Sequence, residues 1–340
     1  MITLSVLDQS PVSSGYTAQD ALKQTVELAK WTDELGYNRF WVAEHHNTNG
    51  LAGSSPLLMM THLASQTSHI RIGSGGVLLP QYSSYKVAED VQLLENLYPN
   101  RIDLGLGRSP GGDALTRLAL TDGVRKSLNE FPRQVQSLIG HLTDSLPREH
   151  DFYGVRAFPK SETKPQLWQL GINKRGGRAA GELGISFTFG HFIQPIGGQE
   201  AIQSYHDSFV PSSYQQTPHT NVCIFVVCAE TEEEATMHAK TLDLWLLKVE
   251  RGGDTTVPSI DEASRYVYTD EERKKIERNR RRMLVGDVAT VKRALLFLQE
   301  KYQNDEFLII TNIHDFEAKK KSYALLAEAF KQGKSDNSSL

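Results

Sequence analysis

The feature that most constrains this fold is an alternation of short apolar runs with longer amphipathic segments along nearly the whole chain. The apolar runs have the length and composition of buried strands, and the segments between them repeat their apolar residues with helical spacing. Eight strands are predicted, at Thr3–Leu7, Arg39–Ala43, Ile70–Leu79, Ile102–Leu106, Gln166–Leu170, Ile185–Phe189, Asn221–Ala229 and Phe307–Thr311. The predicted helices are Ala18–Leu35, Pro56–Gln66, Tyr85–Leu97, Arg125–Leu142, Gly176–Leu183, Gly198–Phe209, Thr231–Val249, Val288–Tyr302 and Phe316–Phe330.

This alternation predicts an α/β fold, and the number of strands selects among the α/β architectures. Eight strands, most of them followed by a helix, are what a closed (β/α)8 TIM barrel requires. An open, doubly wound sheet is the alternative, but it rarely uses eight strands in such even alternation. A chain of 340 residues fits one such barrel, and we predict a single domain over residues 1–332.

Two segments interrupt the alternation. The first, Asp144–Lys164, contains Pro147, Pro159 and many charges, and it is predicted to be a long exposed loop before the fifth strand. The second, Arg251–Val285, is a long insertion before the last helix–strand unit, and insertions of this length often act as lids or binding loops. The final residues, 333–340, are polar and are predicted to be a disordered tail.

Composition argues against several classes of partner and location. The formal net charge of −4 gives no electrostatic reason to expect nucleic acid or an anionic membrane as a partner. The first residues lack the basic region and apolar run of a signal peptide, and no apolar stretch is long enough to span a bilayer. The two cysteines, Cys223 and Cys228, lie in one apolar run, which favours buried thiols in a reducing compartment over a disulfide framework. We therefore expect a cytoplasmic protein.

Candidate catalytic residues follow the second predicted strand, at the carboxyl end where barrel enzymes build their active sites. This strand runs into Glu44, His45 and His46. Because neighbouring strand residues point to opposite faces, only one of the two histidines should face a given pocket. The histidine pair could instead be structural or half of a metal site. A metal site needs three or four converging ligands, and only His191 adds a histidine at the barrel mouth, so we expect no metal.

Glycines and cations follow the next three strands. The third strand contains Gly73–Gly76, where a missing Cβ lets a flat ring or a phosphate approach the backbone, unless the glycines only mark a bulge. The fourth ends in Gly105–Gly112, in which Arg108 is either a phosphate-binding fork or a surface arginine on a turn. The fifth leads through Gly171–Gly177 into a helix, whose N-terminus is a ready anion site. Two neighbouring anion sites predict one phosphorylated ligand, bound by neither a Walker loop nor a GxGxxG loop.

Three blocks of the sequence together resemble the bacterial luciferase-like family of flavin-dependent monooxygenases. The blocks are RFWVAEHH, IRIGSGGVLLPQYSSYKVAEDVQLLENLYPNRIDLGLGRSPGG and a later LG…RAAGELGI segment, in the family's order over nearly the whole chain. The resemblance implies an enzyme that uses molecular oxygen and reduced FMN, the latter supplied by a separate NAD(P)H:flavin reductase. One oxygen atom would enter a small organic substrate by way of a flavin hydroperoxide. The resemblance also implies a homodimer.

The resemblance assigns a catalytic role to one histidine. His45 matches the family's active-site histidine beside the flavin ring, and His46 is expected to be scaffold. Glu44 is a candidate for setting the tautomer of His45. The insertion Arg251–Val285 corresponds in position to the family's mobile loop over the active site.

The cofactor-binding residues implied by the resemblance come from three strands: Gly75, Gly76, Gly107, Arg108, Gly171, Asn173, Gly176 and Gly177. Gly75 and Gly76 match a pair that is joined by a non-proline cis peptide and packs against the isoalloxazine. Arg108 matches a phosphate-binding arginine. After the fifth strand the chain departs from the family's small Ser/Gly-rich pattern and has Ile172, Lys174 and Arg175 instead.

Rival functions stay open at this level. The chain could be a flavin carrier without turnover, or it could use a reduced deazaflavin for hydride transfer on the same barrel. A metal-dependent hydrolase is a third alternative. The substrate is not specified, because one fold hosts many chemistries, and aldehydes, sulfur compounds and other small organic molecules are all compatible with the sequence.

Overall fold

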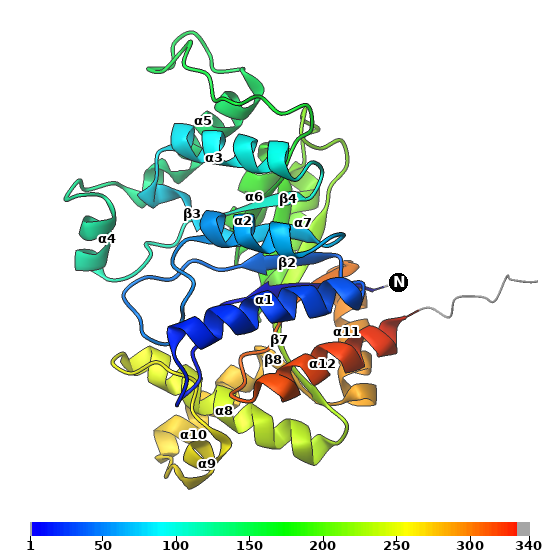
Figure 1. Ribbon diagram of the computed structural model, residues 1–340. Helices are drawn as coiled ribbons and strands as arrows, with labels where there is room; N and C mark the ends of the chain where they lie inside the picture. The colour runs from blue at the N-terminus through cyan, green and yellow to red at the C-terminus, as the bar shows by residue number, and fades with distance from the viewer. Residues whose placement is uncertain (1, 332–340) are drawn as a thin grey trace, which may run out of the picture.

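Eight parallel strands close into a barrel in the structure, a computed structural model that describes residues 2–331 (Figure 1). The order around the barrel is β1–β2–β3–β4–β5–β6–β7–β9, and β9 pairs again with β1. The predicted TIM barrel is therefore confirmed. The strands are β1 (Thr3–Asp8), β2 (Arg39–Val42), β3 (Arg71–Leu78), β4 (Ile102–Gly107), β5 (Gln166–Gly171), β6 (Ser186–Gly190), β7 (Thr220–Ala229), β8 (Met283–Asp287) and β9 (Glu306–Ile310).

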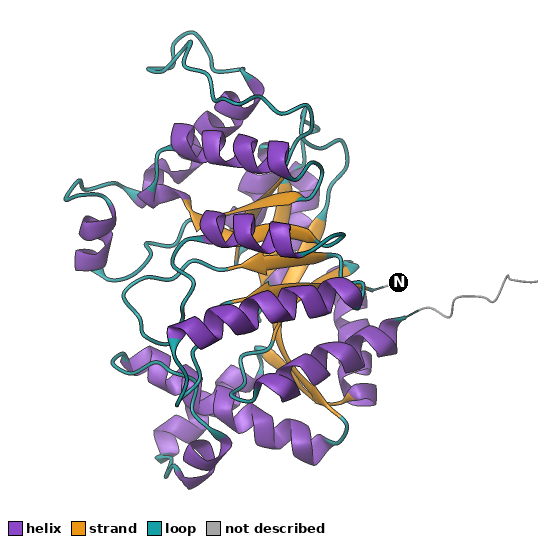
Figure 2. Cartoon of the chain, viewed as in Figure 1, coloured by secondary structure: helices purple, strands orange, loops and turns teal. Residues whose placement is uncertain are grey.

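Helices surround the barrel on its outside (Figure 2). The α-helices are α1 (Ala18–Glu34), α2 (Pro56–Gln66), α3 (Ser84–Leu97), α4 (Ala114–Leu120), α5 (Phe131–Thr143), α6 (Lys174–Glu182), α7 (Gly198–Ser208), α8 (Glu232–Arg251), α9 (Ile260–Arg265), α10 (Asp270–Arg280), α11 (Val288–Tyr302) and α12 (Phe316–Phe330). Two short 3₁₀ helices are η1 (Leu79–Gln81) and η2 (Leu128–Glu130). No helix within residues 2–331 is long and apolar enough to cross a membrane.

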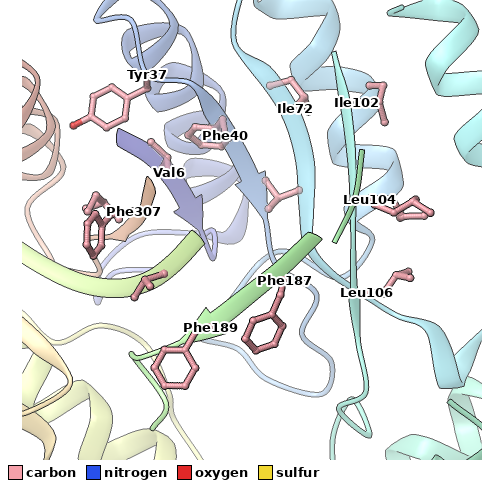
Figure 3. Packing of buried hydrophobic residues seen from close by; sticks show 14 of the residues in the cluster. Val6, Tyr37, Phe40, Ile72, Ile102, Leu104, Leu106, Phe187, Phe189 and Phe307 are labelled. Carbon is pink, nitrogen blue, oxygen red and sulfur yellow. The ribbon is translucent and has the colours of Figure 1, made fainter. Parts of the chain in front are cut away.

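Strand alternation divides the core into an outer and an inner layer. Phe187 and Phe189 of β6 point to the same side, into the layer between the strands and the helices (Figure 3). Trp41, Trp168 and Phe225 belong to a second cluster, which includes the side chains inside the barrel and continues to helix α8. Burying each such side chain stabilises the fold by roughly 1.5–3 kcal/mol, so the closed barrel is the form that hides both faces of every strand.

A buried ionic network closes the amino-terminal end of the barrel. Arg39 pairs with Asp103 at 2.8 Å and with Glu306 at 2.5 Å, and Arg71 pairs with the other oxygen of Asp103 at 2.7 Å. The Arg39 guanidinium also lies 4.7 Å from the ring centroid of Trp168. Each of these charges has an opposite charge beside it, which offsets the cost of burying it. The charged groups at this end are thus paired with one another, so we expect the functional site at the carboxyl end of the barrel.

The structure adds a strand that the sequence pattern did not predict. Strand β8 pairs with the second half of β7, from Phe225 to Ala229, beyond the part of β7 that pairs with β6. Strand β7 has ten residues and extends past its neighbours, so its backbone needs a further hydrogen-bonding partner there. The short run Met283–Val285, placed behind a strongly charged helix, supplies it.

The helices between β4 and β5 differ from the prediction in two ways. Helix α4 was not predicted; none of its residues is buried, so it carries no apolar face that a sequence pattern would show. It stands apart from the other helices beside the loop that follows β2 (Figure 1), and Asn47 of that loop donates to Thr116 at 3.0 Å. Helix α5 begins at Phe131 and not at Arg125, because η2 precedes it and Pro132 favours the first turn of a helix.

The two interrupting segments behave differently. Residues 144–164 form no helix or strand, as predicted. The insertion Arg251–Val285 contains α9, α10 and the start of β8, so it is largely structured. Its first part is anchored to the segment after β1, where Val257 donates to Val12 at 2.9 Å and accepts from Ser14 at 2.8 Å. The predicted tail, 333–340, lies outside the described residues.

Candidate active site at the barrel mouth

His45 lies at the carboxyl end of β2 on the side of the barrel interior. Trp41 and Ala43 belong to the inner cluster, and the next residue with the same orientation is His45. Its Nε2 atom is 3.2 Å from the amide nitrogen of Gln9, which follows β1, and its backbone NH donates to Gly53 at 2.8 Å. Burial, and to a smaller degree the neighbouring His46, lowers the pKa of His45 to about 4. His45 is therefore neutral near pH 7, with one nitrogen that donates and one that accepts.

Glu44 does not contact His45, which corrects the expectation that it sets the tautomer of that residue. It points to the other side of the strand, where its carboxylate accepts from His46 at 2.7 Å and from the Tyr82 hydroxyl at 2.6 Å. The backbone NH of Leu78 completes the shell at 2.8 Å. The buried Glu44 thus ties β2 to the end of β3 and to the segment after it, and His46 belongs to this structural group.

Gly75 and Gly76 are joined by a cis peptide bond in β3, beside the end of β2. A Cβ on Gly75 would lie 2.5 Å from a methyl group of Leu7, and one on Gly76 would lie 2.6 Å from the carbonyl oxygen of Gly105. Gly76 therefore requires glycine for packing alone, because its neighbour is backbone, whereas at Gly75 the neighbour is the end of a flexible leucine side chain that can move. Gly75 is only partly buried, so its backbone remains accessible at the mouth.

Arg108 leaves the sheet directly after β4 and is exposed. Leu106 pairs with Gln169, so Gly107 and Arg108 leave the sheet alongside the end of β5. Gly107 is buried, and a Cβ there would lie 3.1 Å from Leu78. No carboxylate within residues 2–331 forms an ion pair with Arg108, which leaves its guanidinium available to an anion.

Asn173 caps the helix that follows β5. Its side-chain oxygen accepts from the backbone NH of Gly176 at 3.1 Å, which fixes the first turn of α6. Lys174 and Arg175 are exposed in that turn, and among the described residues neither forms an ion pair. Backbone NH groups, the helix dipole and two cations together favour an anion at this position.

The glycines around this helix start have different surroundings. Gly176 has room for a Cβ, because its closest neighbour would be Gly171 at 3.4 Å. Gly171 itself lies close to the ring of Phe187, which would be 2.9 Å from a Cβ added to this glycine. Gly177 is buried and its Cβ would clash with the carbonyl oxygen of Ala201 at 2.1 Å, so close packing of α6 on α7 explains this glycine.

The predicted residues thus fall on four consecutive strands. His45 follows β2, Gly75 and Gly76 belong to β3, and Gly107 ends β4 with Arg108 directly after it. Gly171 ends β5, and Asn173 and Gly176 follow it. Gly177 faces the neighbouring helix instead of the mouth. No group of three or more His, Cys, Asp or Glu residues that could hold a metal occurs within residues 2–331. His191 is buried and contacts Tyr302 at 2.8 Å and the backbone of Arg281 at 3.1 Å.

Two polar residues of the mouth were missed in the sequence. Gln9 follows β1 and contacts His45, and Asn312 follows β9 and donates to Gln9 at 2.6 Å. Both are more than nine-tenths buried. Each is a polar residue close after a barrel strand, and the rule that located the other candidates applies to them equally.

Comparison with known proteins places this chain in a family. A sequence model described as luciferase-like monooxygenase matches residues 2–305. The chain belongs to the luciferase-like monooxygenase family. The uncharacterised protein YceB of Bacillus subtilis (strain 168) is 52% identical over 97% of this chain and 100% of its own length. The N-acetyl-S-alkylcysteine monooxygenase of the same organism is 37% identical over 97% of this chain and 98% of its own length.

Solved structures agree with this assignment. The crystal structure of apo-MsnO8 is similar with a TM-score of 0.89 and 35% identity, covering 97% of this chain and 98% of that chain. Two less similar structures share the fold: the oxygenating constituent of 3,6-diketocamphane monooxygenase from Pseudomonas putida in complex with FMN (17%, TM-score 0.70), and an F420-dependent secondary alcohol dehydrogenase (12%, TM-score 0.68). Each covers 97% of this chain, and they cover 98% and 99% of their own lengths respectively.

Proposed function

We propose that this protein is an FMN-dependent monooxygenase that inserts one atom of molecular oxygen into a small organic substrate. Reduced FMN would come from a separate NAD(P)H:flavin reductase. The observation that carries the proposal is the arrangement of four consecutive strand ends. A neutral histidine follows β2, and the cations after β4 and β5 have no ion-pair partner within residues 2–331. This arrangement suits a ligand with a flat ring at one end and a phosphate at the other.

The donor set fits FMN. Arg108 and the first turn of α6, with Asn173 at its cap, would hold the phosphate, because they offer a planar guanidinium and oriented backbone NH groups. The partly exposed Gly75 would let the ring approach the backbone of β3. When bound, reduced FMN would supply the electrons that activate molecular oxygen.

The protein's own residues would then control protons and water at the mouth. His45 would donate a hydrogen bond to the reacting oxygen, since with a pKa of about 4 its imidazole is neutral near pH 7 and keeps one NH that can donate. The anchored insertion and the exposed helix α4 flank the mouth and would limit the entry of water. Exclusion of water would prevent side reactions that consume oxygen without oxidising the substrate.

The relatives support oxygenation over hydride transfer. The relative with 37% identity is named a monooxygenase, whereas the F420-dependent structure shares only the fold at 12% identity. For the substrate, the name of that relative makes N-acetyl-S-alkylcysteines the first compounds to test. A cytoplasmic location and a homodimer remain part of the proposal.

The test follows oxygen into the product. The full-length protein, FMN, a flavin reductase and NAD(P)H are incubated under ¹⁸O₂ with N-acetyl-S-alkylcysteines, aldehydes and other small organic compounds, and mass spectrometry detects a labelled oxygen atom. We expect one labelled atom per product molecule for one compound class. The His45→Ala variant should keep its FMN affinity but form product about 10²-fold more slowly, the usual size of losing one hydrogen-bond donor to a reacting oxygen.

Two controls separate the rivals. Slow oxygen uptake that yields only hydrogen peroxide with every compound would support a flavin carrier. Tight binding of reduced deazaflavin without measurable binding of FMN would replace the proposal with hydride transfer. Unchanged product formation in His45→Ala would remove that residue from the reaction.

A further inference from the structure

The geometry points to a relay of two buried amides, Asn312 and Gln9, that fixes the tautomer of His45. In this relay Asn312 orients Gln9, and Gln9 orients the ring of His45. The assignment of the tautomer stands on contacts within the chain. Its consequence for catalysis rests on the proposed function.

Two consecutive hydrogen bonds define the relay. The amide nitrogen of Asn312 donates to the amide oxygen of Gln9 at 2.6 Å, which leaves the NH₂ group of Gln9 turned toward His45. That NH₂ group is 3.2 Å from Nε2 of His45. An amide nitrogen only donates, so Nε2 must accept and the ring proton must sit on Nδ1.

The backbone segments that carry the two amides are fastened to their neighbours. Just past Gln9, Ser10 accepts from the backbone NH of Ala52 at 2.9 Å, and its own NH donates to Asp8 at 3.1 Å. On the other side, the residues after Asn312 are fastened to the same segment, where Ser13 donates to the backbone of His314 at 3.0 Å. The ends of β1 and β9 are thereby joined, and the relay lies between them.

The position of the proton on the His45 ring depends on this hydrogen bond with Gln9. Its pKa is lowered to about 4 by burial and by His46, so near pH 7 it has one proton to place. No hydrogen bond to its Nδ1 is found among residues 2–331, and the side chain is partly exposed. The relay therefore presents Nδ1–H to whatever binds at the mouth. Gln9 and Asn312 act as positioning residues, since both work through His45.

The experiment measures the tautomer directly. The full-length protein with ¹⁵N-labelled histidine, without added flavin, is studied by NMR at pH 7, and the His45 signals are identified by their loss in His45→Ala. We expect a protonated Nδ1 and an unprotonated Nε2. A protonated Nε2 would mean that both amides have the reverse orientation, and it would overturn the inference.

Variants of the relay should reverse the tautomer. In Gln9→Glu the carboxylate can only accept, so the proton should move to Nε2. In Asn312→Asp the new carboxylate can only accept a hydrogen bond from Gln9. The Gln9 amide should therefore rotate so that its NH₂ faces this carboxylate and its oxygen faces His45. The ring proton of His45 should again move to Nε2. A His45 signal that stays on the Nδ1–H tautomer in both folded variants would contradict the relay.

A second readout tests the effect on the reaction. Gln9→Met keeps the size of the side chain but not the hydrogen bond to His45. It should lower kcat about 10- to 100-fold, the range typical of removing a residue that orients a functional histidine. The KM should change little. The matched control is Gln92→Met, because Gln92 is also buried and donates at 3.3 Å to the backbone of Leu142, on the outer helices. Equal losses in both variants would reduce Gln9 to a structural role.

The two proposals can fail separately. An Nδ1–H tautomer in a protein that never oxygenates a substrate leaves the relay intact and removes the proposed function. Efficient oxygenation by a protein whose His45 has the Nε2–H tautomer would keep the proposed function and remove the relay.

Discussion

At the scale of residues, strand alternation was the rule that separated the two histidines. It predicted that only one of them faces the interior, and the family resemblance selected His45. In the structure, the same two-residue period places Glu44 and His46 on one side, where their side chains meet at 2.7 Å. The contact between Gln9 and Asn312 could not be predicted in this way. Those residues are 303 positions apart, and only closure of the barrel between β1 and β9 brings them together.

The proposed phosphate site leads to a prediction for Arg108→Ala. Removing one charged hydrogen-bond donor should weaken FMN binding by about 1.5–3 kcal/mol, because a charged hydrogen bond contributes on that scale. Fluorescence titration of FMN measures this change. Arg148→Ala is the control, since Arg148 is also exposed but lies in the loop that leads to the amino end of β5. Equal FMN affinity in both variants would place the phosphate elsewhere.

At the scale of elements, every barrel strand was predictable because each combines an apolar run with a following helix. Strand β8 and helix α4 were not, for opposite reasons. Strand β8 forms because β7 extends past its other neighbours and leaves backbone groups to pair with. The length of β7 cannot be inferred from the sequence around β8. Helix α4 buries none of its residues, so it shows no amphipathic pattern. Local patterns predict elements that bury a face of their own, and these two elements do not.

The start of α6 offers a prediction that separates packing from ligand binding. Gly177→Ala should destabilise the protein by about 1–3 kcal/mol, the usual cost of overpacking, because its Cβ would meet the backbone of Ala201 at 2.1 Å. Gly176→Ala should leave stability nearly unchanged, since its Cβ has room. Urea unfolding measures both. If Gly176→Ala is the more destabilised of the two, the packing of α6 described above is wrong.

At the scale of the whole molecule, the ionic network at the amino end of the barrel predicts how stability depends on pH. Burial opposes ionisation of Glu306, but a hydrogen bond from His219 and the charge of Arg39 outweigh it and lower its pKa from 4.5 to about 2. The carboxylate therefore stabilises the folded state fully above about pH 4.5, and this contribution is lost as the pH falls toward 2. The pKa difference corresponds to about 3 kcal/mol.

Urea unfolding between pH 6 and pH 2 measures this dependence. The wild-type protein should lose stability on acidification more steeply than Glu306→Gln, which has no carboxylate to protonate. Glu300→Gln, at an exposed position on α11, should follow the wild-type curve. Parallel curves for the wild type and Glu306→Gln would show that this network does not govern acid stability.

The same network also limits the routes by which molecules could enter and leave the barrel. Arg39, Asp103 and Glu306 seal one end of the barrel, and the rings of Trp41 and Trp168 fill the space above them. The amino end of the barrel is thus closed by these side chains. Under the proposed function, substrate, flavin and product would all pass through the carboxyl end. A product would then have to leave before the next substrate could bind.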